Sequence, residues 1–128
     1  MIRWSADPTP QARATDSLET VARIMRDMNT DILPVTREGQ LVGIITAFDI
    51  VTRMIAAGED TWLARAADYM TCEVDTCIEG TPPREAMKLM ADKQRRLLPI
   101  VNTRGQLIGA LNRESLEAMT PVASAVLA

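Results

Sequence analysis

Thr46 and Asp49 are the residues whose types and spacing could do chemistry, in the stretch GIITAFDI at positions 43–50. A Thr that ends an aliphatic run, with an acid three positions later, is the pattern of a capping box at a helix start. In that role the two side chains satisfy main-chain N–H groups and stabilise the fold by about 1 kcal/mol. The same residues could bind a ligand, because a helix start attracts phosphate and an ionised carboxylate accepts hydrogen bonds from both hydroxyls of a ribose. The sequence leaves both roles open.

Catalytic groups of the common kinds are missing. The chain of 128 residues contains no His, which excludes Ser-His-Asp and Cys-His arrangements and removes the usual zinc ligand. Cys72 and Cys77 are five positions apart and match neither a thioredoxin-like CxxC nor a four-ligand zinc pattern, so we interpret them as small apolar residues. A Walker-type phosphate loop is also missing. We therefore predict no enzyme, no catalytic residue and no metal site.

Composition and charge argue against nucleic acid and membranes as partners. The chain has 17 acidic and 14 basic residues, a net charge of −3, and only 3% aromatic residues. A nucleic-acid binder is expected to carry a basic face or aromatic stacking platforms. The cluster Lys93-Gln94-Arg95-Arg96 remains available for one small anion. The N-terminus has no apolar stretch of secretory length and no run of about 18 apolar residues occurs, so a soluble, cytoplasmic protein is the default expectation.

The chain contains an internal duplication. Leu33-Pro34-Val35 recurs as Leu98-Pro99-Ile100, 65 positions later, and REGQLVGII at 37–45 recurs as TRGQLIGAL at 103–111, 66 positions later. Both copies of the second segment share Gly-Gln-Leu-aliphatic-Gly. Ordered recurrence of this kind is evidence for a tandem repeat of about 60 residues.

Each copy is expected to fold as strand, helix, strand, strand and helix, a pattern typical of an α+β protein. In the first copy, Asp16 with Glu19 three positions later predicts an N-cap. Pro34 predicts that its strand lies at a sheet edge or that the strand ends there. The expected elements are a helix from Leu18, strands 32–35 and 41–45 joined by a turn at 37–40, and a helix 47–57 ending near Gly58.

The second copy repeats this order. Its first helix opens at Thr81-Pro82-Pro83, where proline suits the first turn. The other expected elements are strands at 73–78, 97–101 and 107–111 and a last helix that begins near Arg113 and stops before Thr120.

The repeated unit, with its aliphatic-Pro-aliphatic strand and its Gly-aliphatic-aliphatic-Thr-x-x-Asp ending, resembles a CBS domain. Asp68-Tyr69-Met70-Thr71 resembles the opening of such a repeat. Two copies resemble a CBS pair, or Bateman module. The resemblance implies two β-α-β-β-α repeats packed about a pseudo-twofold axis, two clefts between them, and a homodimer. The implied boundaries are repeat 1 at 10–58, a connector at 59–67, repeat 2 at 68–119 and a C-terminal tail at 120–128.

The resemblance also implies an adenosine-bearing regulatory ligand, such as AMP, ADP, ATP, S-adenosylmethionine or NADH, with no cofactor required. Ile44, Val74 and Leu97 would then enclose an adenine ring. Arg96 would meet a phosphate, or else is a solvated charge at a strand edge. Carried over onto this sequence, the first cleft comprises Ile44, Thr46, Asp49, Val74, Thr76, Arg96 and Leu97, and the second comprises Ala12, Asp31, Ile32, Asn112 and Ser115.

The two copies differ at the residues that matter for a ligand. In GALNRESL, at 109–116, Asn112 stands in the place of Thr46 and Ser115 in that of Asp49. Asn is a good N-cap, so capping survives in both copies, whereas the acid suited to a ribose survives only in the first. Asp31 in the second cleft would repel a phosphate. The difference fits a specialised first site and a degenerate second one, and neutral drift would look the same.

Two functions therefore compete. One is a stand-alone regulatory module that binds an adenosine nucleotide between the repeats and acts as a ligand sensor in trans, on an unidentified target protein. The alternative is a ligand-free dimerisation or protein-interaction module, which the small apolar tail at 122–128 and the missing second acid favour.

Overall fold

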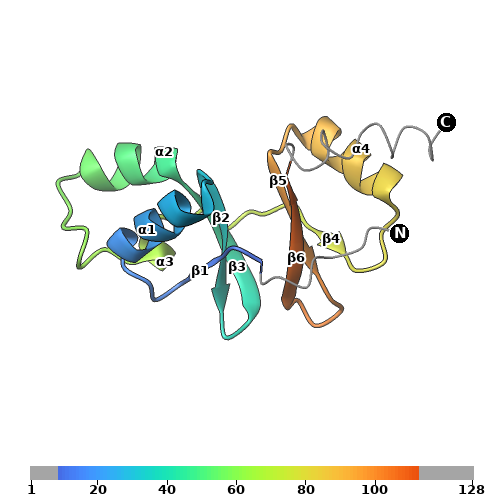
Figure 1. Ribbon diagram of the computed structural model, residues 1–128, viewed down its shortest axis with the longest axis horizontal. Helices are drawn as coiled ribbons and strands as arrows, with labels where there is room; N and C mark the ends of the chain where they lie inside the picture. The colour runs from blue at the N-terminus through green and yellow to red at the C-terminus, as the bar shows by residue number, and fades with distance from the viewer. Residues whose placement is uncertain (1–8, 113–128) are drawn as a thin grey trace. The chain divides into compact units, whose positions relative to one another are not determined.

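The computed structural model describes residues 9–112, which form two compact units divided between Val74 and Asp75 (Figure 1). The predicted last helix, the C-terminal tail and Ser115 lie outside the described residues. Each unit is built around a three-stranded sheet with one parallel and one antiparallel pair, and helices accompany each sheet. The predicted α+β class is confirmed.

The first unit has the strand order β1-β2-β3. Strand β1 (Ala12–Arg13) is parallel to β2 (Ile32–Arg37), and β2 is antiparallel to β3 (Gln40–Thr46). Figure 1 shows the helices of this unit on one side of its sheet. They are α1 (Leu18–Met28), α2 (Ala47–Asp49), the π-helical η1 (Ile50–Ile55) and α3 (Ala66–Tyr69). Apolar residues of α1, β2, β3 and η1 form the core, among them Leu18, Leu33, Ile45 and Met54.

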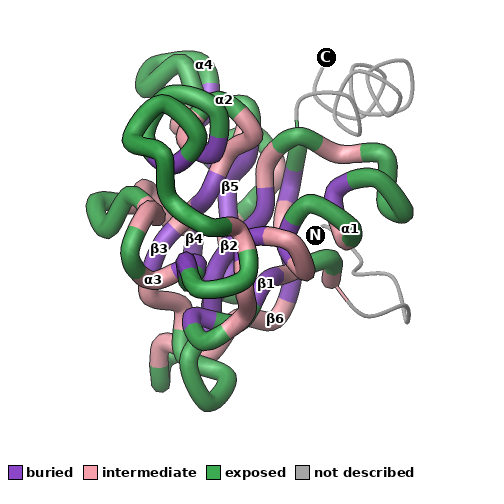
Figure 2. Tube along the Cα trace, turned by 90° about the vertical axis from the view of Figure 1, so that its left-hand side faces the viewer, coloured by how far each residue is buried: buried purple, intermediate pink, exposed green. Residues whose placement is uncertain are grey.

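The second unit repeats this sheet with the order β4-β5-β6. Strand β4 (Cys77–Ile78) is parallel to β5 (Leu97–Val101), which is antiparallel to β6 (Leu107–Asn112), and α4 (Pro83–Lys93) precedes β5. Figure 2 shows buried residues concentrated along β2 and β5, the central strands. The predicted strand at 73–78 is shorter than expected, because only Cys77 and Ile78 find partners on β5.

The prolines of the repeat lie inside these central strands, so the predicted edge position or strand end is wrong. Pro34 is opposite Ile44, whose N–H and C=O are both bonded to Thr71, on the far side of β3. Pro34 and Ile44 therefore form a non-hydrogen-bonded pair. On the other side of Pro34, the pairing with β1 begins only at Val35. The missing N–H of Pro34 thus costs no hydrogen bond between strands.

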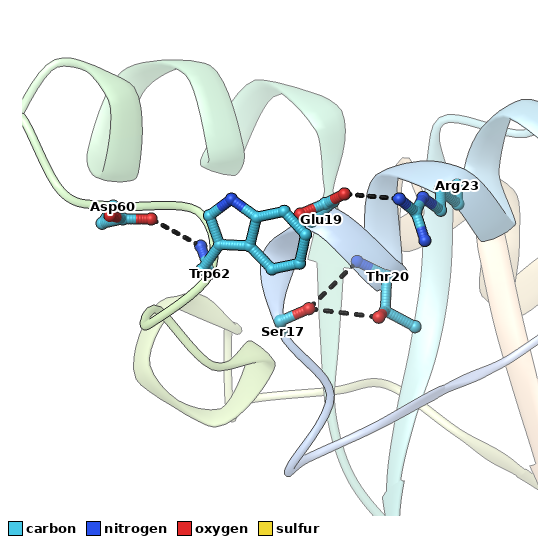
Figure 3. Close-up of polar contacts among 6 residues, drawn as sticks. All are labelled: Ser17, Glu19, Thr20, Arg23, Asp60 and Trp62. Atoms are coloured by element: carbon cyan, nitrogen blue, oxygen red, sulfur yellow. Dashed lines mark hydrogen bonds and ion pairs between the residues drawn. The ribbon is translucent and has the colours of Figure 1, made fainter.

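The N-cap of α1 is Ser17 and not the predicted Asp16. The Ser17 Oγ atom accepts a hydrogen bond from the Thr20 N–H at 3.2 Å, as Figure 3 shows. The Asp16 carboxylate instead accepts a hydrogen bond from the Arg13 N–H at 2.8 Å and closes the turn that follows β1. Ser and Asp are both good N-caps, so the geometry of this turn decides between them.

The connector after η1 packs on the start of α1. The Ala64 carbonyl accepts a hydrogen bond from the Leu18 N–H at 3.0 Å, and the Thr61 carbonyl accepts one from the Glu19 N–H at 3.4 Å. Main-chain groups of the connector thus satisfy donors that a helix start leaves unpaired. Figure 3 shows the indole of Trp62 beside Glu19. The connector is therefore an integral part of the first unit.

A close crossing fixes residues 70–71 on β3. Ile44 and Thr71 exchange two main-chain hydrogen bonds, of 2.9 and 2.8 Å. A Cβ atom at Gly43 would lie 2.7 Å from the Met70 Sδ atom and 2.8 Å from the Thr71 carbonyl oxygen. Only glycine leaves room for this crossing, since real Cβ atoms do not approach heavy atoms so closely.

Gly43→Ala is expected to lower the free energy of unfolding by about 1–3 kcal/mol, the usual cost of overpacking. Urea denaturation measures this change. Where no neighbour is close, replacing glycine by alanine stabilises a compatible position by roughly 0.4–1 kcal/mol. Adding Met70→Ala removes the sulfur contact and leaves the Thr71 carbonyl in place, so the double variant should remain less stable than Met70→Ala alone. A stabilised Gly43→Ala protein would contradict the crossing.

Candidate functional site

Thr46 and Asp49 form a complete capping box at the junction of β3 and α2. The Thr46 Oγ1 atom accepts a hydrogen bond from the Asp49 N–H at 3.0 Å, and the Asp49 Oδ2 atom accepts one from the Thr46 N–H at 3.1 Å. Thr46 has the extended backbone conformation typical of an N-cap. The predicted capping role is confirmed.

The capping box leaves part of the Asp49 carboxylate for other partners. Its Oδ1 atom has no hydrogen-bond partner within residues 9–112, and the residue is half-buried. A carboxylate oxygen accepts two hydrogen bonds, so Oδ1 and the second lone pair of Oδ2 can receive hydroxyl groups. The geometry therefore permits both roles that the sequence left open.

The start of α2 offers few donors for a phosphate. The Ala47 N–H donates to the Asp31 carbonyl at 2.9 Å, and the Asp49 N–H donates to Thr46. A helix start binds anions through N–H groups that lack partners within the helix, and two of them already have acceptors here. The feature of this junction that remains available is an acceptor, the Asp49 carboxylate.

The structure places the predicted site residues as follows. In the first unit, Ile32 is opposite Thr46 in the sheet, so the residues before Pro34 are neighbours of the capping box. In the second unit, Leu97 is opposite Asn112 in the same way. Each predicted cleft combines residues of both units and stays a prediction. The first unit holds Ala12, Asp31, Ile32, Ile44, Thr46, Asp49 and Val74, and the second holds Thr76, Arg96, Leu97 and Asn112.

Ala12 and Ile44 can each offer a ligand only part of the residue: the main chain of Ala12 and the side chain of Ile44. Ala12 is fully buried in the core of the first unit, so only its main chain could meet a ligand. The main chain of Ile44 is already bonded to Thr71, so Ile44 can offer only its half-exposed side chain. This side chain is suited to one face of an apolar ring.

The basic cluster 93–96 is largely engaged in its own unit. Lys93 lies in the last turn of α4, where a cation stabilises the helix dipole. The Arg95 guanidinium forms an ion pair with Asp75, with Nε 2.7 Å from Oδ2. The position of Lys93 and the ion pair of Arg95 give both residues structural roles that the sequence did not reveal.

The sequence reasoning missed Gly43, Met70 and Thr71 as residues that shape the site. The resemblance of residues 68–71 to the opening of a repeat did not reveal that the main chain of Thr71 pairs with Ile44 on β3. A glycine inside a strand pattern is a signal for a close backbone approach, and Gly43 carried that signal.

Tyr69 precedes this crossing and is tied to the turn after η1. Desolvation and, next, the Glu59 carboxylate raise the pKa of the Tyr69 hydroxyl, while Arg53 lowers it. The Arg53 side chain donates to the Tyr69 carbonyl at 2.9 Å. A raised pKa means that the folded state favours the neutral phenol of Tyr69. The neutral phenol therefore adds to the free energy of unfolding at neutral pH, and this addition is lost as the pH rises above the ordinary tyrosine pKa of about 10.

Residues 9–112 offer neither a metal site nor a membrane-spanning helix. Within 9–112, no group of three or more His, Cys, Asp or Glu side chains could hold a metal ion. None of the helices in this part of the chain is long and apolar enough to cross a membrane.

Comparison with known proteins gives consistent matches. The family model described as CBS domain matches residues 6–56 and 66–117. Protein MK0525 of Methanopyrus kandleri is 32% identical over 108 residues, which are 84% of this chain and 55% of that protein. The chain thus spans about half the length of this relative.

Two solved structures show the same fold. The CBS domain pair of protein MJ0100, in complex with 5-methylthioadenosine and S-adenosyl-L-methionine, is 25% identical, with a TM-score of 0.77 and 92% of each chain covered. CBSX2 in complex with AMP is 21% identical, with a TM-score of 0.74, 90% of this chain and 93% of that chain covered.

Thr46→Val removes the capping hydroxyl while keeping the branched shape, and it is expected to lower the free energy of unfolding by about 1 kcal/mol. Thr46→Ser keeps the hydroxyl and should stay much closer to the wild type. Urea denaturation of the three proteins measures the difference. Equal losses for Val and Ser would show that the hydroxyl does not cap α2.

Proposed function

Because the chain belongs to the CBS domain family and carries two copies of the domain, we propose that it is a regulatory module that binds an adenosine nucleotide of the AMP, ADP or ATP class. The observation that carries this proposal is the Asp49 carboxylate, held by the capping box with its Oδ1 atom open to a ligand. The CBS pairs of MJ0100 and CBSX2, which share the fold, were solved with adenosine-bearing molecules. Their ligands support the class of ligand proposed here.

In this proposal Asp49 accepts hydrogen bonds from the ribose hydroxyls, and the Ile44 side chain covers one face of the adenine. A carboxylate suits this task because it offers acceptors only, and a ribose diol offers two donors. The remaining contacts would come from Thr46, Val74, Thr76, Arg96 and Leu97. The second cleft, with Asn112 and Ser115 in place of Thr46 and Asp49, would bind weakly or not at all.

The module would act without catalysis, as a homodimer that passes ligand binding on to a separate target protein. Asp49 is joined directly to η1, so a ligand at its carboxylate contacts the start of a helical segment that runs from 47 to 55. A shift of that segment is one physical route by which occupancy could change the surface presented to a partner.

The competing function is a ligand-free dimerisation or protein-interaction module. One observation favours it: Thr46 and Asp49 are fully explained by the capping box, which stabilises α2 with no ligand bound. The second copy has Ser115 in the place of Asp49, and this absence of a carboxylate also favours the interaction module.

Thermal unfolding with AMP, ADP, ATP, S-adenosylmethionine and NADH separates the two functions. A ligand at 100 times its Kd adds about 2.7 kcal/mol, which raises the Tm by several degrees for a chain of this size. Asp49→Asn is the matched variant, since its amide oxygen can still accept the Thr46 N–H while the charge is lost. The shift should disappear in this variant and its ligand-free Tm should stay close to the wild type. No shift with any ligand at millimolar concentration would favour the interaction module.

Titration calorimetry is expected to give one nucleotide per chain, because only the first copy retains the acid. Two sites of similar affinity would show that the carboxylate is not what selects the cleft.

A further inference from the structure

The connector after η1 exposes two large apolar side chains that are adjacent in the chain. Trp62 and Leu63 are 64% and 74% exposed. The next residue, Ala64, is buried and belongs to the core of the first unit. Because Ala64 already anchors the connector in this core, the side chains of Trp62 and Leu63 remain available at the surface. Exposed apolar side chains that lie together mark contact surfaces.

The hydrogen bonds that fix the connector do not involve the side chains at positions 62 and 63. The Asp60 carboxylate accepts a hydrogen bond from the Trp62 N–H at 2.8 Å (Figure 3), and the Asp60 carbonyl accepts one from the Ala64 N–H at 2.9 Å. The Glu59 N–H donates to the Met54 carbonyl at 3.2 Å, which ties the connector to the end of η1. A main chain that is fixed in this way reduces the entropy lost when a partner binds.

The surroundings of Trp62 are acidic. Residues 54–64 include Glu59 and Asp60, which are both exposed, and contain no Lys or Arg. Figure 3 shows the Glu19 side chain beside the indole. Its Oε1 atom is in an ion pair, whereas its Oε2 atom is buried and has no hydrogen-bond partner in the described part of the chain. The negative charge next to this indole is therefore only partly neutralised.

The two arginines that flank the connector use their side chains on main-chain groups of the first unit. Arg53 donates to the Tyr69 carbonyl at 2.9 Å, and Arg65 donates to the Thr15 carbonyl at 3.4 Å. Within residues 9–112 neither arginine forms an ion pair with the acids at positions 59 and 60. These two carboxylates therefore stay available for a cation from outside the chain.

We propose that Glu59, Asp60, Trp62 and Leu63 form a docking surface for a basic segment of the target protein, in which Arg or Lys stands next to an aliphatic residue. The inference deepens the proposed function and rests on it for the existence of a target protein. Trp is the aromatic side chain that attracts a cation most strongly. Arg suits the surface best, because its planar guanidinium stacks on an indole and donates to carboxylates. Leu63 offers the apolar contact for the neighbouring aliphatic residue.

Charge separates this occupant from three others. A contact of the docking surface with itself across a twofold axis would bring Glu59 and Asp60 of two copies together, and like charges at an interface are unfavourable. Nucleic acids and anionic lipid head groups carry the same sign of charge as the two acids. A basic segment matches both the carboxylates and the indole.

The test is an NMR titration of the 15N-labelled chain with synthetic peptides, in the absence of nucleotide. The probe is acetyl-Arg-Leu-Arg-Leu-amide, and the controls carry Gln or Glu in the place of Arg. The Arg peptide should shift the indole N–H signal of Trp62 and the main-chain signals of residues 59–64 in a saturable way. The Gln and Glu peptides should leave these signals in place. Trp62→Leu identifies the indole signal, since it removes it.

Three variants measure what each part of the docking surface contributes. Glu59→Gln with Asp60→Asn keeps an amide oxygen for the Trp62 N–H, and it should weaken binding of the Arg peptide about 2- to 30-fold, the range for two exposed ion pairs. Trp62→Leu keeps an apolar side chain and should weaken binding about 2- to 5-fold, because the cation loses the indole face. Glu79→Gln with Asp92→Asn makes the same change of net charge with two exposed acids of the second unit, and it should leave the affinity unchanged.

Equal shifts with the Arg and Gln peptides would overturn the match of charge. Equal weakening by the two double variants would reduce the binding to a general attraction between a basic peptide and an acidic chain, and would overturn the docking surface. No shift at residues 59–64 with millimolar Arg peptide would overturn it as well. Phosphatidylglycerol vesicles or a short oligothymidylate that shifted the Trp62 signal would overturn the basic occupant. Since no nucleotide is present, none of these results changes the thermal-shift test of the nucleotide site.

Discussion

Two main-chain hydrogen bonds between Ile44 and Thr71 join the segment after α3 to the strand that carries the proposed site. They attach the segment after α3 to the free edge of β3, over a glycine that has no side chain to prevent the approach. With Thr71 fixed, both main-chain groups of Ile44 are satisfied on the side away from β2. The ladder then tolerates Pro34 opposite Ile44, and the capping box follows two residues later on the same strand. The connector reaches this point after it has supplied acceptors to the start of α1. One crossing thus positions the sheet, the helix start and the chain that leads into the second unit.

The side chains of this capping box can stabilise the fold and can also bind a ligand. Asp49 uses one carboxylate oxygen for the Thr46 N–H and keeps the other free of protein partners in the described part of the chain. An acid in this position does not have to leave its structural role in order to bind a ribose. This arrangement also keeps the side chain in one orientation before a ligand arrives, which reduces the entropy lost on binding.

The duplication helps to separate what the fold requires from what one copy has acquired. Both copies keep the proline strand and the glycine of the hairpin partner, and each ends its last strand on a residue type that is a good N-cap, Thr46 or Asn112. Only the first copy has an acid three positions after the cap residue: Asp49 follows Thr46, whereas Ser115 holds the matching position after Asn112.

The sequence by itself determined the α+β class, the two repeats, the hairpin strands, the helix that ends near Gly58 and the cap at Thr46, because these depend on local periodicity, turn residues and recurrence. Tertiary structure alone decided the rest. It selected Ser17 over Asp16 as a cap through the turn after β1, and it placed Pro34 in a central strand because its neighbour β1 begins pairing one residue later. It also tied Thr71 to the first unit and left Phe48 exposed. Such outcomes depend on which distant main-chain groups meet, and hydrogen bonds between distant segments leave little trace in the order of residue types.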